Sequence, residues 1–134
     1  WSDPHLISIV LNSPPNKPTI EGPVHVLPFI TYKYTIYATD DDGDNVRFYI
    51  DWGDGSSQWY GPFASGEIAT VEHKWKKSST IKIKARDTVG DESEWTILEI
   101  ILPKNKALTF NTIILKLLQR FSKFFSILNF LPNL

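Results

Sequence analysis

Residues 46–55 read Val-Arg-Phe-Tyr-Ile-Asp-Trp-Gly-Asp-Gly, and this stretch decides the fold. Positions 46, 48, 50 and 52 are apolar and share one face of an extended chain, while the positions between them form the other face. Two glycines then supply backbone freedom, and Asp54-Gly55 is typical of a tight hairpin turn. The stretch therefore predicts a half-buried β-strand that runs into a sharp turn.

The same alternation recurs along most of the chain, between short groups of turn residues. The predicted strands cover residues 17–22, 30–39, 46–52, 58–63, 67–74, 79–87 and 94–102. One buried and one solvent-exposed face per strand is typical of an antiparallel β-sandwich. The aromatic content of 13% also favours β-structure. We therefore expect an all-β, immunoglobulin-like sandwich.

Two segments rich in proline and asparagine or lysine, residues 12–18 and 103–106, read as linkers. They bound the predicted sandwich domain, residues 19–102. Residues 1–11 are predicted either as the last strand of a preceding, similar repeat in a tandem array or as an N-terminal extension. A neighbouring repeat of the same chain is then one expected contact.

The tail, residues 107–134, has a different pattern. Over residues 107–131 its apolar positions recur at three- and four-residue spacing, which predicts an amphipathic α-helix with a basic polar side. Lys116, Arg120 and Lys123 interrupt the apolar run, so it is too charged for a membrane span of about 20 residues. Such a helix can lie in a membrane interface, dock on a partner, act as a C-terminal sorting tag or pack on the sandwich.

Composition and motifs argue against several classes of function. A net charge of -1 disfavours nucleic-acid binding, and the absence of cysteine excludes disulfides and thiolate metal sites. The serines stand in turn-like contexts, the three histidines are scattered, and no nucleophile elbow or phosphate loop is present. We therefore predict a protein that is not an enzyme, and we expect His73 to hydrogen-bond the turn at residues 53–55 or its carboxylates.

Four motifs occur in order at sensible spacing: Asp40-Asp41-Asp42-Gly43, Asp51-Trp52-Gly53-Asp54-Gly55, His73-Lys74-Trp75 and Ala85-Arg86-Asp87-Thr88-Val89-Gly90. With these motifs the chain resembles PKD (polycystic kidney disease) domains over residues 16–102. The resemblance implies an immunoglobulin-like sandwich on an extracellular or cell-envelope protein. It also implies adhesion, spacing or protein–protein contact as the function, with a protein or polysaccharide at the cell surface as the partner.

The acidic loop at residues 40–44 carries four aspartates around Gly43. Carboxylates this close repel one another, and a hard cation such as calcium, which takes six to eight oxygens, would relieve the repulsion. An ordinary solvated turn is the alternative, because aspartate and glycine dominate turns. From the residues alone, we expect Asp41 and Asp44 to face water.

The resemblance implies a particular ligand set for that cation. Some PKD domains bind calcium beside the linker through carboxylates that match Asp40, Asp42 and Asp87. Linker oxygens near residues 12–16, here represented by Asn16, would complete the set. Calcium bound there would stiffen the angle between modules.

Aromatic residues allow a second function. Trp59 and Tyr60 stand beside a turn, and exposed rings could stack on sugars, as in an accessory polysaccharide-binding module of a secreted hydrolase. Packing within a strand is the alternative explanation for this pair. Trp52, Trp75 and Trp95 fall at or near predicted strand ends, where we expect their large rings to close the core.

Overall fold

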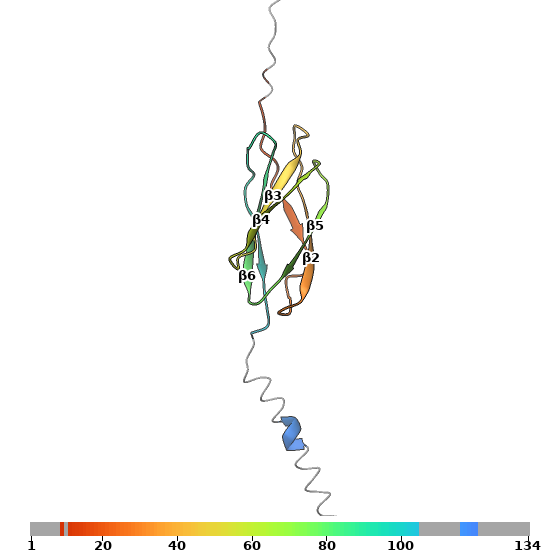
Figure 1. Ribbon diagram of the computed structural model, residues 1–134, viewed down its shortest axis with the longest axis vertical. Coiled ribbons are helices and arrows are strands. Elements are labelled where there is room, and N and C mark those ends of the chain that lie inside the picture. The colour runs from red at the N-terminus through yellow and green to blue at the C-terminus, as the bar shows by residue number, and fades with distance from the viewer. Residues whose placement is uncertain (1–8, 10, 105–115, 121–134) are drawn as a thin grey trace, which may run out of the picture. The chain divides into compact units, whose positions relative to one another are not determined.

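The computed structural model describes residues 9, 11–104 and 116–120, and in this part of the chain the residues up to Pro103 form an antiparallel β-sandwich (Figure 1). Its strands are β1 (Thr19–Glu21), β2 (Thr31–Tyr37), β3 (Val46–Asp51), β4 (Ser57–Phe63), β5 (Ala69–Lys74), β6 (Ser79–Arg86) and β7 (Thr96–Ile100). Each lies inside or within one residue of a strand predicted above. The alternation of apolar and polar residues therefore predicted each of the strands that the described residues form.

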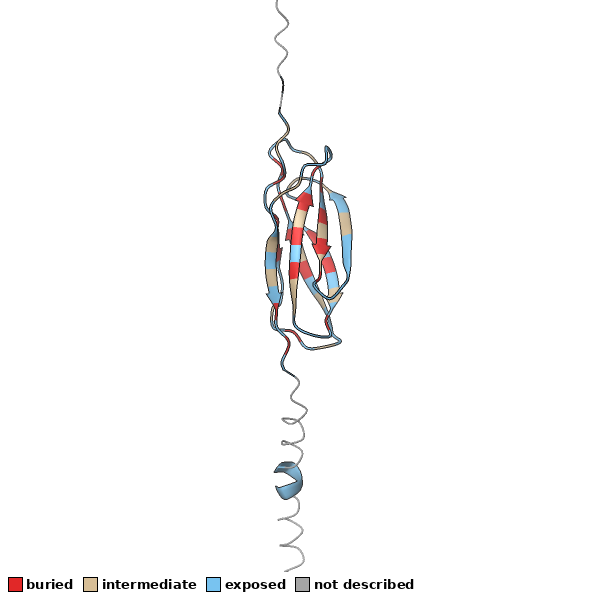
Figure 2. Ribbon diagram, turned by 90° about the vertical axis from the view of Figure 1, so that its left-hand side faces the viewer, coloured by how far each residue is buried: buried red, intermediate tan, exposed pale blue. Residues whose placement is uncertain are grey.

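The strands form two sheets, one with the order β1-β2-β5 and the other with the order β4-β3-β6-β7. All neighbouring strands of the larger sheet run antiparallel. Its strand order places β4 and β7 at the two edges. Buried and exposed positions alternate along strands such as β3 and β6, seen as bands of red and pale blue in Figure 2, and the two sheets pack through their buried faces. This arrangement confirms the expected immunoglobulin-like sandwich.

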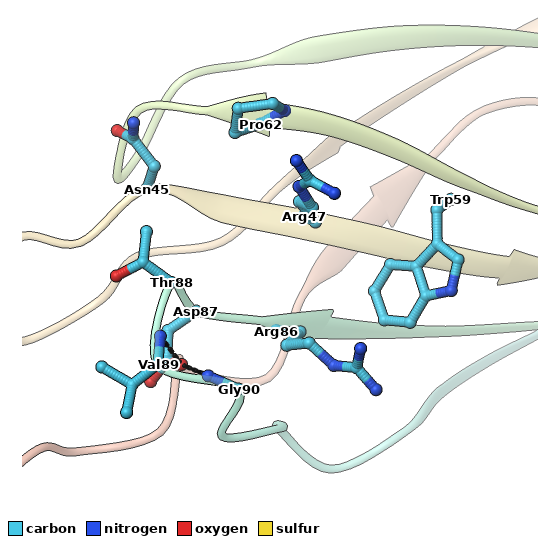
Figure 3. Close-up of a pocket in the computed structure, with 9 residues that line it drawn as sticks. All are labelled: Asn45, Arg47, Trp59, Pro62, Arg86, Asp87, Thr88, Val89 and Gly90. Atoms are coloured by element: carbon cyan, nitrogen blue, oxygen red, sulfur yellow. Dashed lines mark hydrogen bonds between the residues drawn. The ribbon is translucent and has the colours of Figure 1, made fainter.

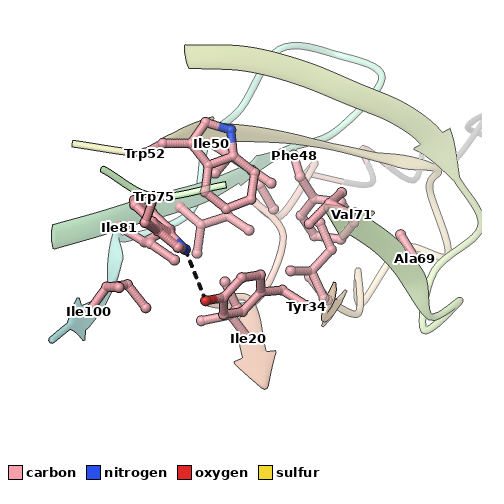
Figure 4. Packing of buried hydrophobic residues seen from close by; sticks show 14 of the residues in the cluster. Ile20, Tyr34, Phe48, Ile50, Trp52, Ala69, Val71, Trp75, Ile81 and Ile100 are labelled. Atoms are coloured by element: carbon pink, nitrogen blue, oxygen red, sulfur yellow. Dashed lines mark hydrogen bonds between the residues drawn. The ribbon is translucent and has the colours of Figure 1, made fainter. Parts of the chain in front are cut away.

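The apolar positions of residues 46–52 are buried, as their alternation predicts. Val46, Phe48 and Ile50 are fully buried and Trp52 is 2% exposed. Trp75 is also fully buried, and its indole Nε1 donates a hydrogen bond of 3.2 Å to the hydroxyl of Tyr34 in the core (Figure 4). That hydroxyl donates in turn to the carbonyl of Pro23 at 2.9 Å, so the polar atoms of both rings are satisfied inside the sandwich.

Trp95 is the exception among the predicted core tryptophans. It stands just before β7, whose inward residues are Leu98 and Ile100, and the alternation therefore turns Trp95 outward. Its side chain is 40% exposed and lies edge-on to Tyr49, with ring centres 6.1 Å apart. The prediction that Trp95 closes the core is wrong.

The predicted C-terminal helix is described only at residues 116–120, which are helical. The rest of residues 107–131, and the predicted N-terminal segment 1–11 except for Ile9 and Leu11, lie outside the described residues. Within the described part of the chain, no helix has both the length and the apolar character that crossing a membrane requires.

Candidate functional site: an acidic cluster beside the N-terminal linker

Asp40 holds the acidic loop, residues 40–44, together through hydrogen bonds to its carboxylate. It follows β2, is only 5% exposed, and its backbone N–H donates a hydrogen bond of 2.8 Å to the hydroxyl oxygen of Ser65. Its Oδ1 accepts the backbone N–H groups of Asp42 at 2.9 Å and Asp44 at 3.2 Å. Gly43, in the left-handed region with φ of 78°, allows the chain to turn around this carboxylate.

Asp87 plays the same part in the loop that follows β6. It too is 5% exposed, and its Oδ1 accepts the backbone N–H groups of Val89, Gly90 and Asp91 at 2.7–2.9 Å. Its Oδ2 accepts the side-chain amide of Asn12 at 2.7 Å. Burial tends to raise the pKa of the Asp87 carboxyl, but the hydrogen bonds from Asn12 and the loop amides outweigh it and hold that pKa below its ordinary value.

The two loops bring three carboxylates together, which we call the acidic cluster. Asp40, Asp44 and Asp87 each offer one carboxylate oxygen, and these three atoms lie within 4.8 Å of one another. The Oδ2 atom of Asp40 is buried and has no hydrogen-bond partner among the described residues. A buried carboxylate oxygen without a donor is costly, and clustered like charges add repulsion. A bound divalent cation with a preference for oxygen would relieve both costs.

The N-terminal linker, residues 12–18, is hydrogen-bonded to the same end of the sandwich. The side-chain amide of Asn12 donates to Asp87 and, at 2.8 Å, to Asp91, and the backbone nitrogen of Ser13 donates to the carboxylate of Asp42 at 2.6 Å. Further along, the backbone nitrogen of Asn16 donates to the carbonyl of Thr39 at 2.8 Å. The loops that hold the acidic cluster therefore also hold the linker.

The structure unites only part of the predicted ligand set. Asp40 and Asp87 lie together as expected, but the third carboxylate comes from Asp44, which we expected to face water. Asp42 instead binds the linker, and the side-chain nitrogen of Asn16 donates to Asp41 at 3.0 Å. The direction in which the loop turns around Asp40 decides which of the neighbouring aspartates face Asp87, and sequence spacing does not show that direction.

Trp59 and Tyr60, the predicted sugar-binding pair, point to opposite faces of β4. Tyr60 is half-buried and packs against the core. Trp59 lies on the outer face of the larger sheet against Tyr49, with ring centres 5.1 Å apart, and the guanidinium of Arg86 stands 4.5 Å from its ring centre. The two rings therefore do not form one continuous stacking surface.

His73 takes the structural role that the sequence predicted. Its Nε2 lies 2.7 Å from Oδ2 of Asp54 in the turn after β3, and its ring stacks on Trp52 with centres 4.3 Å apart. Histidine and turn are thereby joined across the two sheets, which confirms the expected contact.

Comparison with solved structures agrees with this architecture. The PKD domain of an M14-like peptidase from Thermoplasmatales archaeon SCGC AB-540-F20 is 43% identical over an alignment that covers 70% of this chain and 100% of that domain, with a TM-score of 0.68. The sulfur carrier protein SoxY from Chlorobium limicola f thiosulfatophilum shares 13% identity, with 68% of this chain and 86% of that chain covered and a TM-score of 0.51, so it supports the fold alone. No family model and no curated protein matches.

Fold and likeness together define the class of protein as an immunoglobulin-like β-sandwich module. The chain belongs to the PKD domain family, to which its four motifs had pointed. PKD domains are generally non-catalytic accessory modules and are typically extracellular.

Proposed function

We propose that this chain is a non-catalytic accessory module of a secreted or cell-surface protein, and that calcium bound at the acidic cluster fixes its N-terminal linker. The proposal rests above all on the convergence of the Asp40, Asp44 and Asp87 carboxylates, together with the buried Oδ2 of Asp40, which has no hydrogen-bond donor among the described residues. Such a module would hold neighbouring modules apart and would contact proteins at the cell surface. The similarity to a solved PKD domain of an M14-like peptidase supports the accessory role, since that domain is one part of a peptidase.

Calcium would act on the linker through Asp87, a carboxylate that belongs to the acidic cluster and also contacts the linker. Asp87 belongs to the acidic cluster and also accepts the Asn12 amide, so a cation that orders Asp87 also orders the point where the linker meets the sandwich. Oxygen donors from two aspartate-rich loops are the ligand type that calcium prefers. A linker held in this way would keep the module at a fixed angle to whatever precedes it.

Thermal unfolding of the whole chain in millimolar calcium and in chelator tests the proposal. Selective binding to the folded state stabilises it by about 2.7 kcal/mol at a calcium concentration of 100 times Kd, so the wild-type melting temperature should rise with calcium. Asp44→Asn should abolish the rise, whereas Asp42→Asn should keep it, because Asp42 lies outside the cluster. Asp54→Asn, in a turn at the other end of β3, serves as a control for loss of an aspartate. No calcium-dependent rise in the wild type would contradict the proposal.

A further inference from the structure

The outer face of the larger sheet places two arginines directly opposite each other. Arg47 of β3 and Arg86 of β6 are partners in the strand register, and both side chains are exposed. Like charges at opposed positions of neighbouring strands destabilise a sheet unless something compensates them. The arrangement therefore calls for an explanation that strand pairing alone does not supply.

One of the two arginines has a carboxylate partner. Arg86 donates from Nε, at 2.9 Å, and from Nη2 to Oε1 of Glu92, and the other oxygen of Glu92 accepts from Lys84. The guanidinium of Arg86 also stands over the ring of Trp59, which favours a fixed orientation through cation–π attraction. Arg86 is consequently held in place, and Glu92 is shared between two cations.

Arg47 is different, because no carboxylate lies within 4.0 Å of it among the residues that the structure describes. Lys84 and Arg86 share the carboxylate of Glu92, and Arg47 has no such partner among the described residues, which leaves an excess of positive charge on this part of the sheet. The excess lies beside a pocket of about 540 Å³. That volume falls within the ~300–1,000 Å³ range of pockets that bind small ligands.

The pocket combines charged, polar and apolar walls (Figure 3). Asn45 and Pro62 line one side and the loop at residues 87–90 lines the other, with Arg47 between them and Trp59 at the far end. Asp87 in this loop is only 5% exposed, and its carboxylate already accepts hydrogen bonds from the amides of residues 89–91 and from Asn12. Guanidinium groups are planar forks that match the two oxygens of a carboxylate. The amide of Asn45 and the hydroxyl of Thr88 both donate and accept hydrogen bonds, as neighbouring hydroxyls of a sugar require.

We propose that this pocket binds a carboxylate-bearing sugar of an acidic polysaccharide, with Arg47 as the main contact to the carboxylate. Arg86, preorganised by Glu92 and Trp59, adds the second positive charge. Trp59 and Pro62 offer apolar surface to the carbon-bound hydrogens of the sugar ring. A neutral glycan would leave the charge of Arg47 uncompensated, and an acidic peptide would make little use of the amide and hydroxyl walls.

The inference goes beyond the proposed function, since it concerns ligand binding rather than the linker. The probe is trigalacturonate, added to the whole ¹⁵N-labelled chain in millimolar calcium while the indole signal of Trp59 and the amide of Gly90 are followed by NMR. Fully methyl-esterified trigalacturonate supplies the same rings without charge, and a short polyglutamate peptide supplies carboxylates without sugar. We expect only trigalacturonate to shift both signals in a saturable manner.

Two variants that each remove one positive charge distinguish binding at the pocket from nonspecific electrostatic attraction to this face of the sheet. Arg47→Gln should weaken binding roughly tenfold or more, because it removes a charge-assisted, bidentate contact. Lys82→Gln lies on the same face of the sheet, outside the pocket, and should weaken binding less than about twofold, since exposed charges are screened by salt.

Several results would overturn the inference. They are the absence of any shift with trigalacturonate, equal losses in the two variants, or binding of the methyl ester or the peptide as tight as that of the acid. Binding that survives Arg47→Gln but disappears with chelator would also overturn it, because calcium rather than the arginine would then hold the carboxylate. A chain that binds no calcium but still binds trigalacturonate through Arg47 would refute the proposed function alone.

Discussion

Nε2 of His73 and Oδ2 of Asp54 lie 2.7 Å apart and join the end of β5 to the turn that follows β3. Strands β3 and β5 belong to different sheets, so the contact closes one end of the sandwich. His73 also stacks on Trp52, with an angle of 5° between the ring planes, and lies edge-on to Trp75. The turn motif and the histidine motif, separate in the sequence, are therefore one structural unit.

Removal of this unit should be measurable as a loss of stability. We expect His73→Ala to lower the free energy of unfolding by about 1–3 kcal/mol, through loss of a charged hydrogen bond and of aromatic packing. Urea denaturation at neutral pH provides the measurement. Glu72→Ala is the matched control at the adjacent position, where the exposed pair with Lys33 should contribute less than about 1 kcal/mol. Equal effects of the two substitutions would contradict the structural role of His73.

Two glycines of the same turn should respond differently to alanine. Gly53 and Gly55 have φ values of 73° and 95°, so alanine is strained at both positions. A Cβ at Gly53 would also stand 2.3 Å from the carbonyl oxygen of Thr80, whereas a Cβ at Gly55 would meet nothing within 4 Å. We expect Gly55→Ala to cost about 1–2 kcal/mol and Gly53→Ala clearly more, by the same denaturation experiment. A larger cost at Gly55 would show that the close approach of Thr80 is not the limiting contact.

Acid should destabilise the sandwich through carboxylates whose hydrogen bonds favour the ionised form. Hydrogen bonds from Lys84 and then Arg86 lower the pKa of Glu92, and at Asp54 the bonds from Ser56 and His73 lower the pKa despite the opposing effect of burial. A carboxyl with a lowered pKa in the folded state binds its proton more readily when unfolded. Its contribution is therefore complete above the unfolded pKa and is lost as the pH falls through the folded pKa.

The corresponding measurement is the free energy of unfolding against pH. We expect it to decline progressively below about pH 5. In Glu92→Gln the decline should be shallower, whereas Glu72→Gln, in an exposed ion pair, should leave the slope unchanged. A Glu92→Gln profile parallel to that of the wild type would contradict the account of the Glu92 contacts.

The sequence predicted the strands because side chains alternate with a period of two, a local property that any window of the chain displays. Nearness to a strand end does not by itself place Trp95 in the core, because the same alternation puts Leu98 inside and residue 95 outside. A period of two, counted back from Leu98, predicts the exposed position of Trp95.

The site was less predictable because it depends on contacts between distant residues. The loop could be recognised as acidic, but the capture of its amides by Asp40 turns Asp44 toward Asp87 and Asp42 toward the linker. The opposition of Arg47 and Arg86 likewise requires the register of β3 against β6. An Asp-x-x-x-Asp spacing around a glycine was the one local sign that Asp40 and Asp44 could face the same ligand.

The most direct test of the central claim is a calcium titration of the whole ¹⁵N-labelled chain, followed through its backbone amides. If calcium binds the acidic cluster and fixes the linker, saturable shifts should concentrate at residues 12–16, 40–44 and 87–91 and should disappear in Asp44→Asn. Absence of shifts at millimolar calcium, or shifts confined to residues remote from Asp40 and Asp87, would contradict the claim.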